Sequence, residues 1–254
     1  MLPLTRQLTH PRQDNVRAFC PLQTSRFISS IEREINQRGL TVECMTDFTE
    51  LNRECDLIDD KLGATEPFSN LFFDIVPSQG FWIRGTDPEG RLSHVQAMRL
   101  DNLEGISLAD HWAQQLRRIH CDPNPGARLS GGGAPAAHMI TGRVVYHGEM
   151  WIAQHMRGRG LGGYLSRLAL GLAQARWAPD FVYGFVKTDL VRAGFAVREG
   201  YMHMQPEGIA WDQAPSNINA DDWIVWMGRE DLTYLVQQVP AFVQRAPVQM
   251  RLHS

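Results

Sequence analysis

The feature that most constrains this chain is a strand-like run that passes through a glycine-rich turn straight into an amphipathic helix. Residues 143–153 have the composition of a strand, and residues 161–177 have the spacing of a helix. The turn between them reads Met156-Arg157-Gly158-Arg159-Gly160-Leu161-Gly162-Gly163. One face of the helix carries Leu161, Leu165, Leu168 and Leu172. A β–loop–α unit of this kind is typical of α/β proteins.

The turn has the chemistry of an anion-binding site. Glycines let the backbone approach a ligand closely and point successive N–H groups at it. The N-terminus of the following helix adds unsatisfied donors and about half a positive charge. Arg157 and Arg159 add full charges. We therefore expect a phosphate or pyrophosphate group to bind here.

Two nucleotide-binding patterns can be tested against this turn. Gly158, Gly160 and Gly163 satisfy G-x-G-x-x-G, the dinucleotide fingerprint. That fold also needs an acidic residue about 20 positions on, at the end of the next strand. Asp180, the nearest acid at that spacing, precedes the next strand instead. A nicotinamide oxidoreductase is therefore disfavoured, and a Walker loop is excluded because the sequence contains no Gly-Lys-Ser/Thr.

Periodicity divides the rest of the chain into further helices and strands. Expected helices span 25–38, a segment capped by Asp47 that ends near Gly63, 107–120, 189–198 and 231–239. Expected strands span 41–45, 81–85, 92–100, 181–186, 201–204 and 222–227. Residues 70–76 fit either state, and 121–137, with three prolines and Gly131-Gly132-Gly133, are expected to form a loop. Strands grouped around one β–loop–α unit favour a mixed α/β sheet over two independent domains.

Composition excludes several classes of function. The 25 Lys and Arg residues against 28 Asp and Glu residues give a net charge of −3, so we expect no nucleic-acid partner. The four cysteines lie far apart without a C-x-x-C pair, which argues against a zinc cluster, and no metal is expected. No apolar run approaches the roughly 18 residues that span a bilayer, and residues 1–16 are polar. We therefore expect a cytoplasmic protein without a membrane span.

The segment Glu149 to Gly163 resembles motif A of the GNAT superfamily of N-acetyltransferases, whose strand and turn read E-L-Y-V-x-P-x-x-R-G-x-G-L-G. The matching residues are Glu149, Trp151, Ile152, Arg157, Gly158, Gly160, Leu161 and Gly162. Residues 195–201 look like the family's short helix ending in Gly-Phe, with Gly200-Tyr201 in that place. The resemblance is specific over residues 141–204 and looser elsewhere.

The resemblance implies a GNAT fold, a mixed and mostly antiparallel central sheet flanked by helices, here with an N-terminal extension and a helical insertion. It implies acetyl-CoA or another acyl-CoA as co-substrate, with its pyrophosphate on residues 157–163. The pantetheine arm is expected to pair with the strand at residues 150–152, and Asp189 stands where the family has Asn. The cofactor-binding residues implied are Met150, Trp151, Ile152, Arg157, Gly158, Arg159, Gly160, Leu161, Gly162, Gly163 and Asp189.

The family's usual acid and base are missing. The Tyr that often serves as the acid falls at Ala196, and a frequent Glu base falls at Gly184. Forming a free amine at neutral pH costs about 4 kcal/mol, which a base or a water chain can help to supply. We predict Glu149 as the base, because it lies on the strand that carries the thioester, and Tyr201 as the acid. A surface carboxylate, a ring that fills the sheet, and reaction through water alone are the alternatives.

The predicted organisation is an N-terminal arm and helix (1–40), an acyltransferase domain (41–240) with an insertion (102–140), and a tail (241–254). The leading function is transfer of acetyl from acetyl-CoA to the amine of a small-molecule or peptide acceptor by direct attack. The insertion also looks like that of N-acyl amino acid and acyl-homoserine lactone synthases, which use longer acyl chains. A non-catalytic acyl-CoA sensor is a further alternative, and a homodimer is a reasonable expectation for the family.

Overall fold

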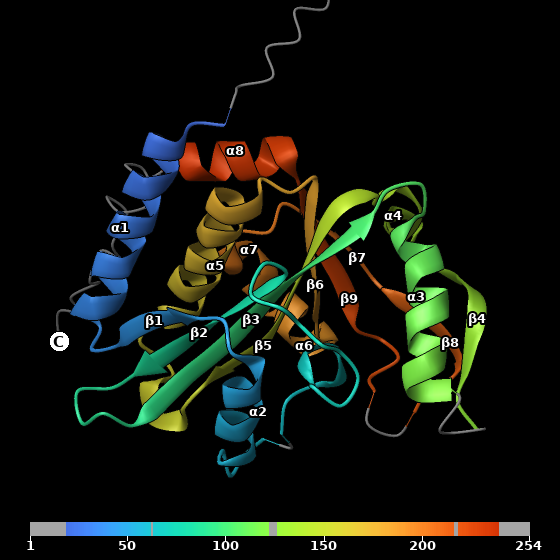
Figure 1. Ribbon diagram of the computed structural model, residues 1–254, viewed down its shortest axis with the longest axis horizontal. Coiled ribbons are helices and arrows are strands. Elements are labelled where there is room, and N and C mark those ends of the chain that lie inside the picture. The colour runs from blue at the N-terminus through green and yellow to red at the C-terminus, as the bar shows by residue number, and fades with distance from the viewer. Residues whose placement is uncertain (1–18, 62, 122–125, 216–217, 239–254) are drawn as a thin grey trace, which may run out of the picture.

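The centre of the molecule is a seven-stranded sheet, seen in the computed structural model of residues 19–61, 63–121, 126–215 and 218–238 (Figure 1). Its strands are β1 (Thr41–Met45), β2 (Gly80–Thr86), β3 (Leu92–Leu103), β5 (Gly142–Ile152), β6 (Phe181–Val186), β7 (His203–Gln205) and β9 (Trp223–Gly228). They lie in the order β1-β2-β3-β5-β6-β9-β7. Neighbours are antiparallel except β5 and β6, which are parallel. The predicted mixed, mostly antiparallel sheet is therefore confirmed.

Helices cover both faces of this sheet. They are α1 (Pro21–Gln37), α2 (Phe48–Asp56), α3 (Leu108–Leu116), α4 (Pro135–Met139), α5 (Leu161–Trp177), α6 (Thr188–Arg192), α7 (Phe195–Glu199) and α8 (Arg229–Gln237). Asp47 caps α2 as predicted, since its carboxylate accepts hydrogen bonds from the backbone N–H groups of Thr49 and Glu50 at 2.8 and 3.3 Å. The bounds of α5 and β6 are those that the sequence predicts.

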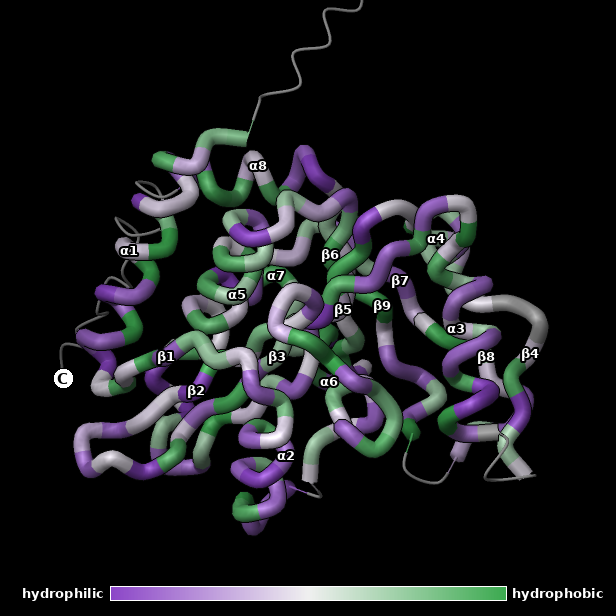
Figure 2. Tube along the Cα trace, in the orientation of Figure 1, coloured by the Kyte–Doolittle hydropathy of each residue, from purple (hydrophilic) through white to green (hydrophobic). Residues whose placement is uncertain are grey.

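The alternation of side chains along β2 explains the two layers of the core. Phe81 and Ile83 belong to the cluster under α1, α5 and α8, whereas Trp82 between them belongs to the cluster under α2. Helices α1 and α5 pack against each other and each also contacts the sheet, and a Cβ at Gly171 would lie 3.0 Å from the Phe27 ring. In Figure 2 the hydrophobic residues of α1 face α5 and its hydrophilic residues face outward.

The predicted loop at 121–137 is wrong for much of its length. Residues Arg128–Gly133 form β4, which pairs with β8 (Ile209–Gln213) in a second, two-stranded sheet, and α4 follows at once. Glycine and proline content hides this strand, because its pairing depends on backbone groups and on a distant partner that was not predicted. Residues 122–125 lie outside the described residues.

Two expected helices are also divided. The helix at 107–120 ends as α-helix at Leu116 and continues as a π-helical turn, Arg117–Cys121. The segment 189–198 holds two short helices, α6 and α7, separated at Gly194, whose φ of +74° is left-handed. Residues 70–76 are turns and irregular backbone.

The first predicted segment does not stand apart from the sheet. Phe27, Ile31 and Ile35 of α1 are buried in the main core cluster. Residues 1–18 of the predicted arm and the tail at 241–254 lie outside the described residues. Within the described part of the chain, no helix has both the length and the apolar content required to cross a membrane.

Candidate functional site

The two parallel strands diverge halfway along their length and open a cavity. β5 pairs with β6 only from Val144 to Tyr146, opposite Phe181 to Tyr183. Beyond this point β5 continues against β3, and β6 continues against β9. The space between them is a cavity of about 520 Å³, lined by residues of both strands. This volume lies within the range usual for small-molecule sites.

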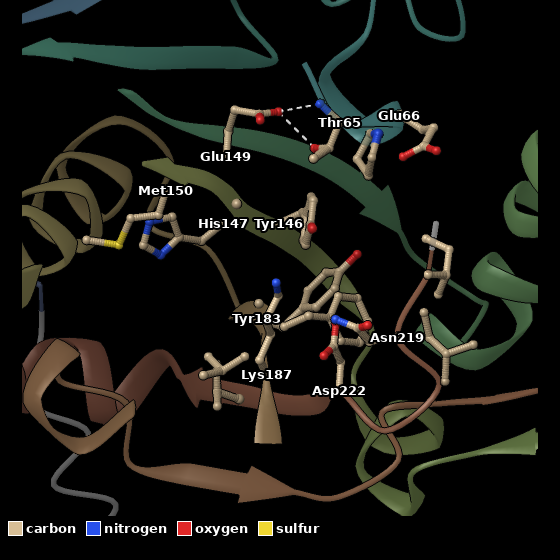
Figure 3. A pocket seen from close by; sticks show the side chains of 18 of the residues that line it. Thr65, Glu66, Tyr146, His147, Glu149, Met150, Tyr183, Lys187, Asn219 and Asp222 are labelled. Atoms are coloured by element: carbon tan, nitrogen blue, oxygen red, sulfur yellow. Dashed lines mark hydrogen bonds between the residues drawn. The ribbon is translucent and has the colours of Figure 1, made fainter. Parts of the chain in front are cut away.

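A β-bulge shapes the β5 side of this cavity. Glu149 and Met150 together oppose the single Gln96 of β3, and Glu149 has a left-handed φ of 61°. Such a conformation costs a non-glycine residue about 1–3 kcal/mol. The bulge sends the two side chains in different directions: Glu149 toward Thr65, and Met150 toward α5 (Figure 3).

Glu149 is fully engaged by a neighbouring segment. Its side chain is completely buried and forms an ion pair with Lys61. Its other oxygen accepts hydrogen bonds from the backbone N–H and the hydroxyl of Thr65, both at 2.8 Å. The carboxylate therefore fastens Lys61 and Thr65 to the bulge. It also lines the cavity, and its role as a base stays a prediction.

The glycine-rich turn leaves room for a ligand. Gly158 and Gly160 have left-handed φ angles of 79° and 72°, and a Cβ on either would meet no atom within 4 Å. Among the described residues, no side chain caps the N-terminus of α5. A Cβ on Gly162 would lie 3.4 Å from Phe195 and 3.9 Å from Met150, two residues that line the cavity. The open turn therefore adjoins the cavity, and its uncapped backbone fits a pyrophosphate.

The two arginines of the turn already have partners. Arg157 forms an ion pair with Asp60 at 3.0 Å and donates to the carbonyl of Ile152 at 2.8 Å. Asp60 also accepts the indole N–H of Trp151 at 2.7 Å. Arg159 donates over 3.4 Å to the carbonyl of Arg38. These contacts of Arg157 connect the turn to β5 and to Asp60.

The remaining predicted cofactor residues lie in three different environments: one in the core, one at a helix contact and one on the surface. Leu161 is buried in the core, and a Cβ on Gly163 would lie 2.5 Å from the carbonyl of Arg198, so glycine here allows α5 to approach α7. Asp189 lies exposed in the first turn of α6, outside the lining of the cavity. It is not the N-cap of that helix, a position that Lys187 occupies.

Tyr201 belongs to a buried chain of hydrogen bonds. Gln96 donates its amide N–H to the carbonyl of Leu165 at 2.8 Å, so its oxygen faces Nε2 of His147 at 3.1 Å. His147 must therefore donate from Nε2, which leaves Nδ1 to accept the hydroxyl proton of Tyr201 at 2.8 Å. The hydroxyl turns its proton toward His147 and its oxygen lone pairs remain for other partners.

Burial shifts the pKa values of the two titratable groups in this hydrogen-bonded chain. It lowers the pKa of His147 to about 4 and raises the pKa of Tyr201 well above its usual value of 10. A Cβ on Gly184 would lie 2.8 Å from the carbonyl of His147 and 3.4 Å from the Tyr201 hydroxyl. Glycine at position 184 therefore makes space for the Tyr201–His147 pair.

The sequence did not point to Glu199 as a site residue. This residue ends α7, is 3% exposed and lines the same cavity. Burial raises the pKa of its carboxyl to about 8. The only signal in the sequence is its position, three residues after Ala196, on a helix that is too short to show a clear period.

The cavity has two ends of different character. The turn end is lined by Met150, Phe195, Glu199 and Tyr201, and the turn at 157–163 adjoins it through Gly162. The insertion end comprises Phe73, Trp112, Leu116, Ile119 and Trp211. Trp112 packs against the rings of Tyr183 and Phe185, with centroids 5.7 and 5.3 Å apart.

Two polar atoms at the insertion side lack a partner among the described residues. They are the indole nitrogen of Trp211 and one carboxylate oxygen of Asp222, which Figure 3 shows beside Tyr183. A buried donor and a buried acceptor without partners are costly unless a ligand or water satisfies them. Elsewhere, in the part of the chain that the structure describes, no three His, Cys, Asp or Glu residues gather as a metal site.

We compared the chain with protein families, curated proteins and solved structures. No protein-family profile and no curated protein matches the chain. Among solved structures, the chain is similar to the spermidine/spermine N-acetyltransferase SpeG from Vibrio cholerae, with 14% identity, coverage of 75% of this chain and 93% of that one, and a TM-score of 0.41. It is also similar to an acetyltransferase of the GNAT family from Streptococcus pneumoniae, with 11% identity, coverage of 74% and 99%, and a TM-score of 0.42.

Proposed function

We propose that the protein is an N-acyltransferase that moves acetyl from acetyl-CoA to the amine of a small-molecule or peptide acceptor by direct attack. The observation that carries this proposal is the divergence of β5 and β6 beyond Tyr146 and Tyr183. It provides a strand edge and a cavity next to the open, uncapped N-terminus of α5. A pyrophosphate on that N-terminus would direct its attached arm toward the strand edge.

Each part of this arrangement has a task in amide formation. The backbone N–H groups of the turn hold the anion. The edge of β5 at 150–152 that faces away from β3 offers main-chain groups to an extended arm, apart from the Ile152 carbonyl, which Arg157 already occupies. The cavity would hold the amine against the thioester carbonyl, which supplies proximity. A backbone N–H of the strand can stabilise the oxyanion of the tetrahedral intermediate.

A longer acyl chain is the second candidate donor, and the insertion end favours it. Five apolar side chains line that end, so it can receive either the apolar body of an acceptor or an acyl chain longer than acetyl. The unpartnered atoms of Trp211 and Asp222 offer one donor and one acceptor to a polar group there.

The test combines binding with turnover. The purified chain is heated with coenzyme A and with its acetyl, butyryl and octanoyl thioesters, and thiol release is then followed across a panel of amines. We expect coenzyme A to raise the melting temperature and at least one amine to release thiol. Stabilisation by NADH but not by coenzyme A would favour the oxidoreductase instead. Tight binding without thiol release would favour a sensor.

The cytoplasmic location and the homodimer remain predictions. Analytical ultracentrifugation with and without coenzyme A measures the second of them directly.

A further inference from the structure

Helix α7 presents an acidic side chain to the wall of the cavity. Ala196 and Glu199 are its two buried residues, and a spacing of three places them on one face of the helix. Ala196 carries no proton to give. Glu199, almost one turn further along, is the residue of this face that can exchange one, and it lines the cavity at the turn end.

The carboxyl group of Glu199 has an unused oxygen. The residue is 3% exposed, and its Oε1 has no hydrogen-bond partner among the described residues. A buried carboxylate oxygen without a donor is costly, so the neutral, protonated form is favoured. In that form the group holds a proton beside the cavity.

The groups that face Glu199 do not reverse this preference. Arg167 of α5 lowers the pKa of the carboxyl, but desolvation is the larger effect and the pKa lies at about 8. The guanidinium of Arg167 also donates to the carbonyls of Gly163 and Arg198. Tyr201 is neutral, and its hydroxyl is hydrogen-bonded to His147, which burial keeps neutral as well.

We propose that Glu199 is the catalytic acid that protonates the departing thiolate, an inference that rests on the proposed function. The amine nitrogen attacks the thioester carbonyl carbon, the C–N bond forms, and the C–S bond breaks with its electron pair on sulfur. The Glu199 O–H gives its proton to that sulfur, which leaves as a thiol. The proton lost from nitrogen returns to the Glu199 carboxylate through solvent, so that the acid is restored.

Two neighbouring groups are less suited to this step. Tyr201 directs its proton to His147, and donation would leave a buried phenolate. The carboxylate oxygens of Glu149 already accept from three donors, the ammonium of Lys61 and the N–H and hydroxyl of Thr65, so this group is occupied in fastening its neighbours. Glu199 is also matched to its task, because an acid transfers a proton best when its pKa is near the working pH.

The experiment measures kcat from pH 6 to 10, with a saturating acyl thioester and amine, in the wild type and in Glu199→Gln. In the wild type, kcat falls as the pH rises through about 8, because the acid loses its proton. In Glu199→Gln, kcat at pH 7 falls about 100-fold. The decrease of kcat at alkaline pH, the alkaline limb of the profile, also disappears. Glu199→Asp restores part of the rate. Glu149→Gln retains the alkaline decrease of kcat. The substitution of the exposed Glu230 by Gln retains both the wild-type kcat and its alkaline decrease.

A second measurement needs no turnover. Infrared difference spectra of the free protein between pH 6.5 and 9.5 should show a protonated carboxyl band that Glu199→Gln lacks, while coenzyme A binds both forms equally. A wild-type rate with an unchanged pH profile in Glu199→Gln overturns the assignment and leaves the proposed function intact. A limb that instead rises through pH 8 and depends on Glu199 makes it a base and overturns the acid role. If the wild type neither binds coenzyme A nor releases thiol, the proposed function fails, and this inference fails with it.

Discussion

The two ends of the cavity differ in the chemical groups that line them. The turn end depends on main-chain groups and on buried polar side chains, among them the chain from Gln96 through His147 to Tyr201. The insertion end depends on apolar and aromatic side chains from α3, the π-helical turn and β8. One end can recognise charge and move protons, whereas the other can recognise only shape, apolar area and one or two polar groups.

This difference separates two tasks. Backbone donors at a helix N-terminus bind a phosphate whatever the rest of the ligand is, so the turn end suits a co-substrate common to many reactions. Rings and aliphatic chains that close over a cavity select among the substrates that enter it, so the insertion end suits the variable partner. Substitutions at one end should therefore leave the task of the other intact.

Gly160→Asp should show the largest effect, a loss of affinity for coenzyme A, and this effect should be confined to the turn end. The new carboxylate stands at the uncapped N-terminus of α5, where at about 4 Å it would oppose each phosphate charge by roughly 4 kcal/mol. We expect coenzyme A to bind at least about 100-fold more weakly, measured by titration calorimetry.

Gly90→Asp is the matched control for that variant. Gly90 also has a left-handed φ, of 79°, and open space around it, but it lies in the β2–β3 turn. Both variants place Asp in the same backbone conformation, so the strain is alike and only the location differs. Equal loss of affinity in both would show that the turn at 157–163 is not the anion site.

The pH dependence of the free energy of unfolding should also arise mainly from buried histidines on the turn side. Burial lowers the pKa of His147 to about 4 and that of His94 to about 3. Each is neutral in the folded state, so above pH 6.5 neither favours unfolding, and below it the unfolded chain takes up protons first. Each should reduce the free energy of unfolding by about 2 kcal/mol between pH 6.5 and 5.

Urea denaturation at pH 7 and pH 5 measures this loss. His147→Gln removes one of the two titrations and should reduce the difference between the two pH values. His120→Gln at the insertion side should change it less, because burial lowers the pKa of His120 but the nearby Glu66 opposes that effect. An undiminished difference in His147→Gln would mean that this histidine is protonated in the folded state.

The turn end could be predicted from sequence because its signals are local. Glycine spacing, an apolar stripe and a strand of one composition lie within about 40 consecutive residues, and they fixed α5 and β6 without error. Glu199 was not predicted because a single Glu carries no spacing, and His147 was not predicted as part of this site. Their burial, and the cavity they face, arise only when α7 and β5 meet.

The insertion end was hidden for a different reason. β4 reads as a glycine-rich loop, and it becomes a strand through β8, about 80 residues later. Trp112 gives a helical stripe with Leu108 and Leu116, but the stripe does not reveal that it faces a cavity. Apolar side chains predict burial, and the identity of the partner, protein or ligand, is set by tertiary structure.

Leu116→Trp should give the smallest effect and be confined to the insertion end. Leu116 is half-buried and lines the cavity, so a larger ring there fills space that a long acyl chain or a bulky acceptor would use. We expect kcat/KM for such substrates to fall about tenfold, a loss of about 1.4 kcal/mol, with coenzyme A affinity unchanged. Gln114→Trp, exposed on the same helix and outside the cavity, is the control. If short and long substrates lose rate equally while the melting temperature stays constant, the insertion end does not select the substrate, and the division of tasks between the two ends is wrong.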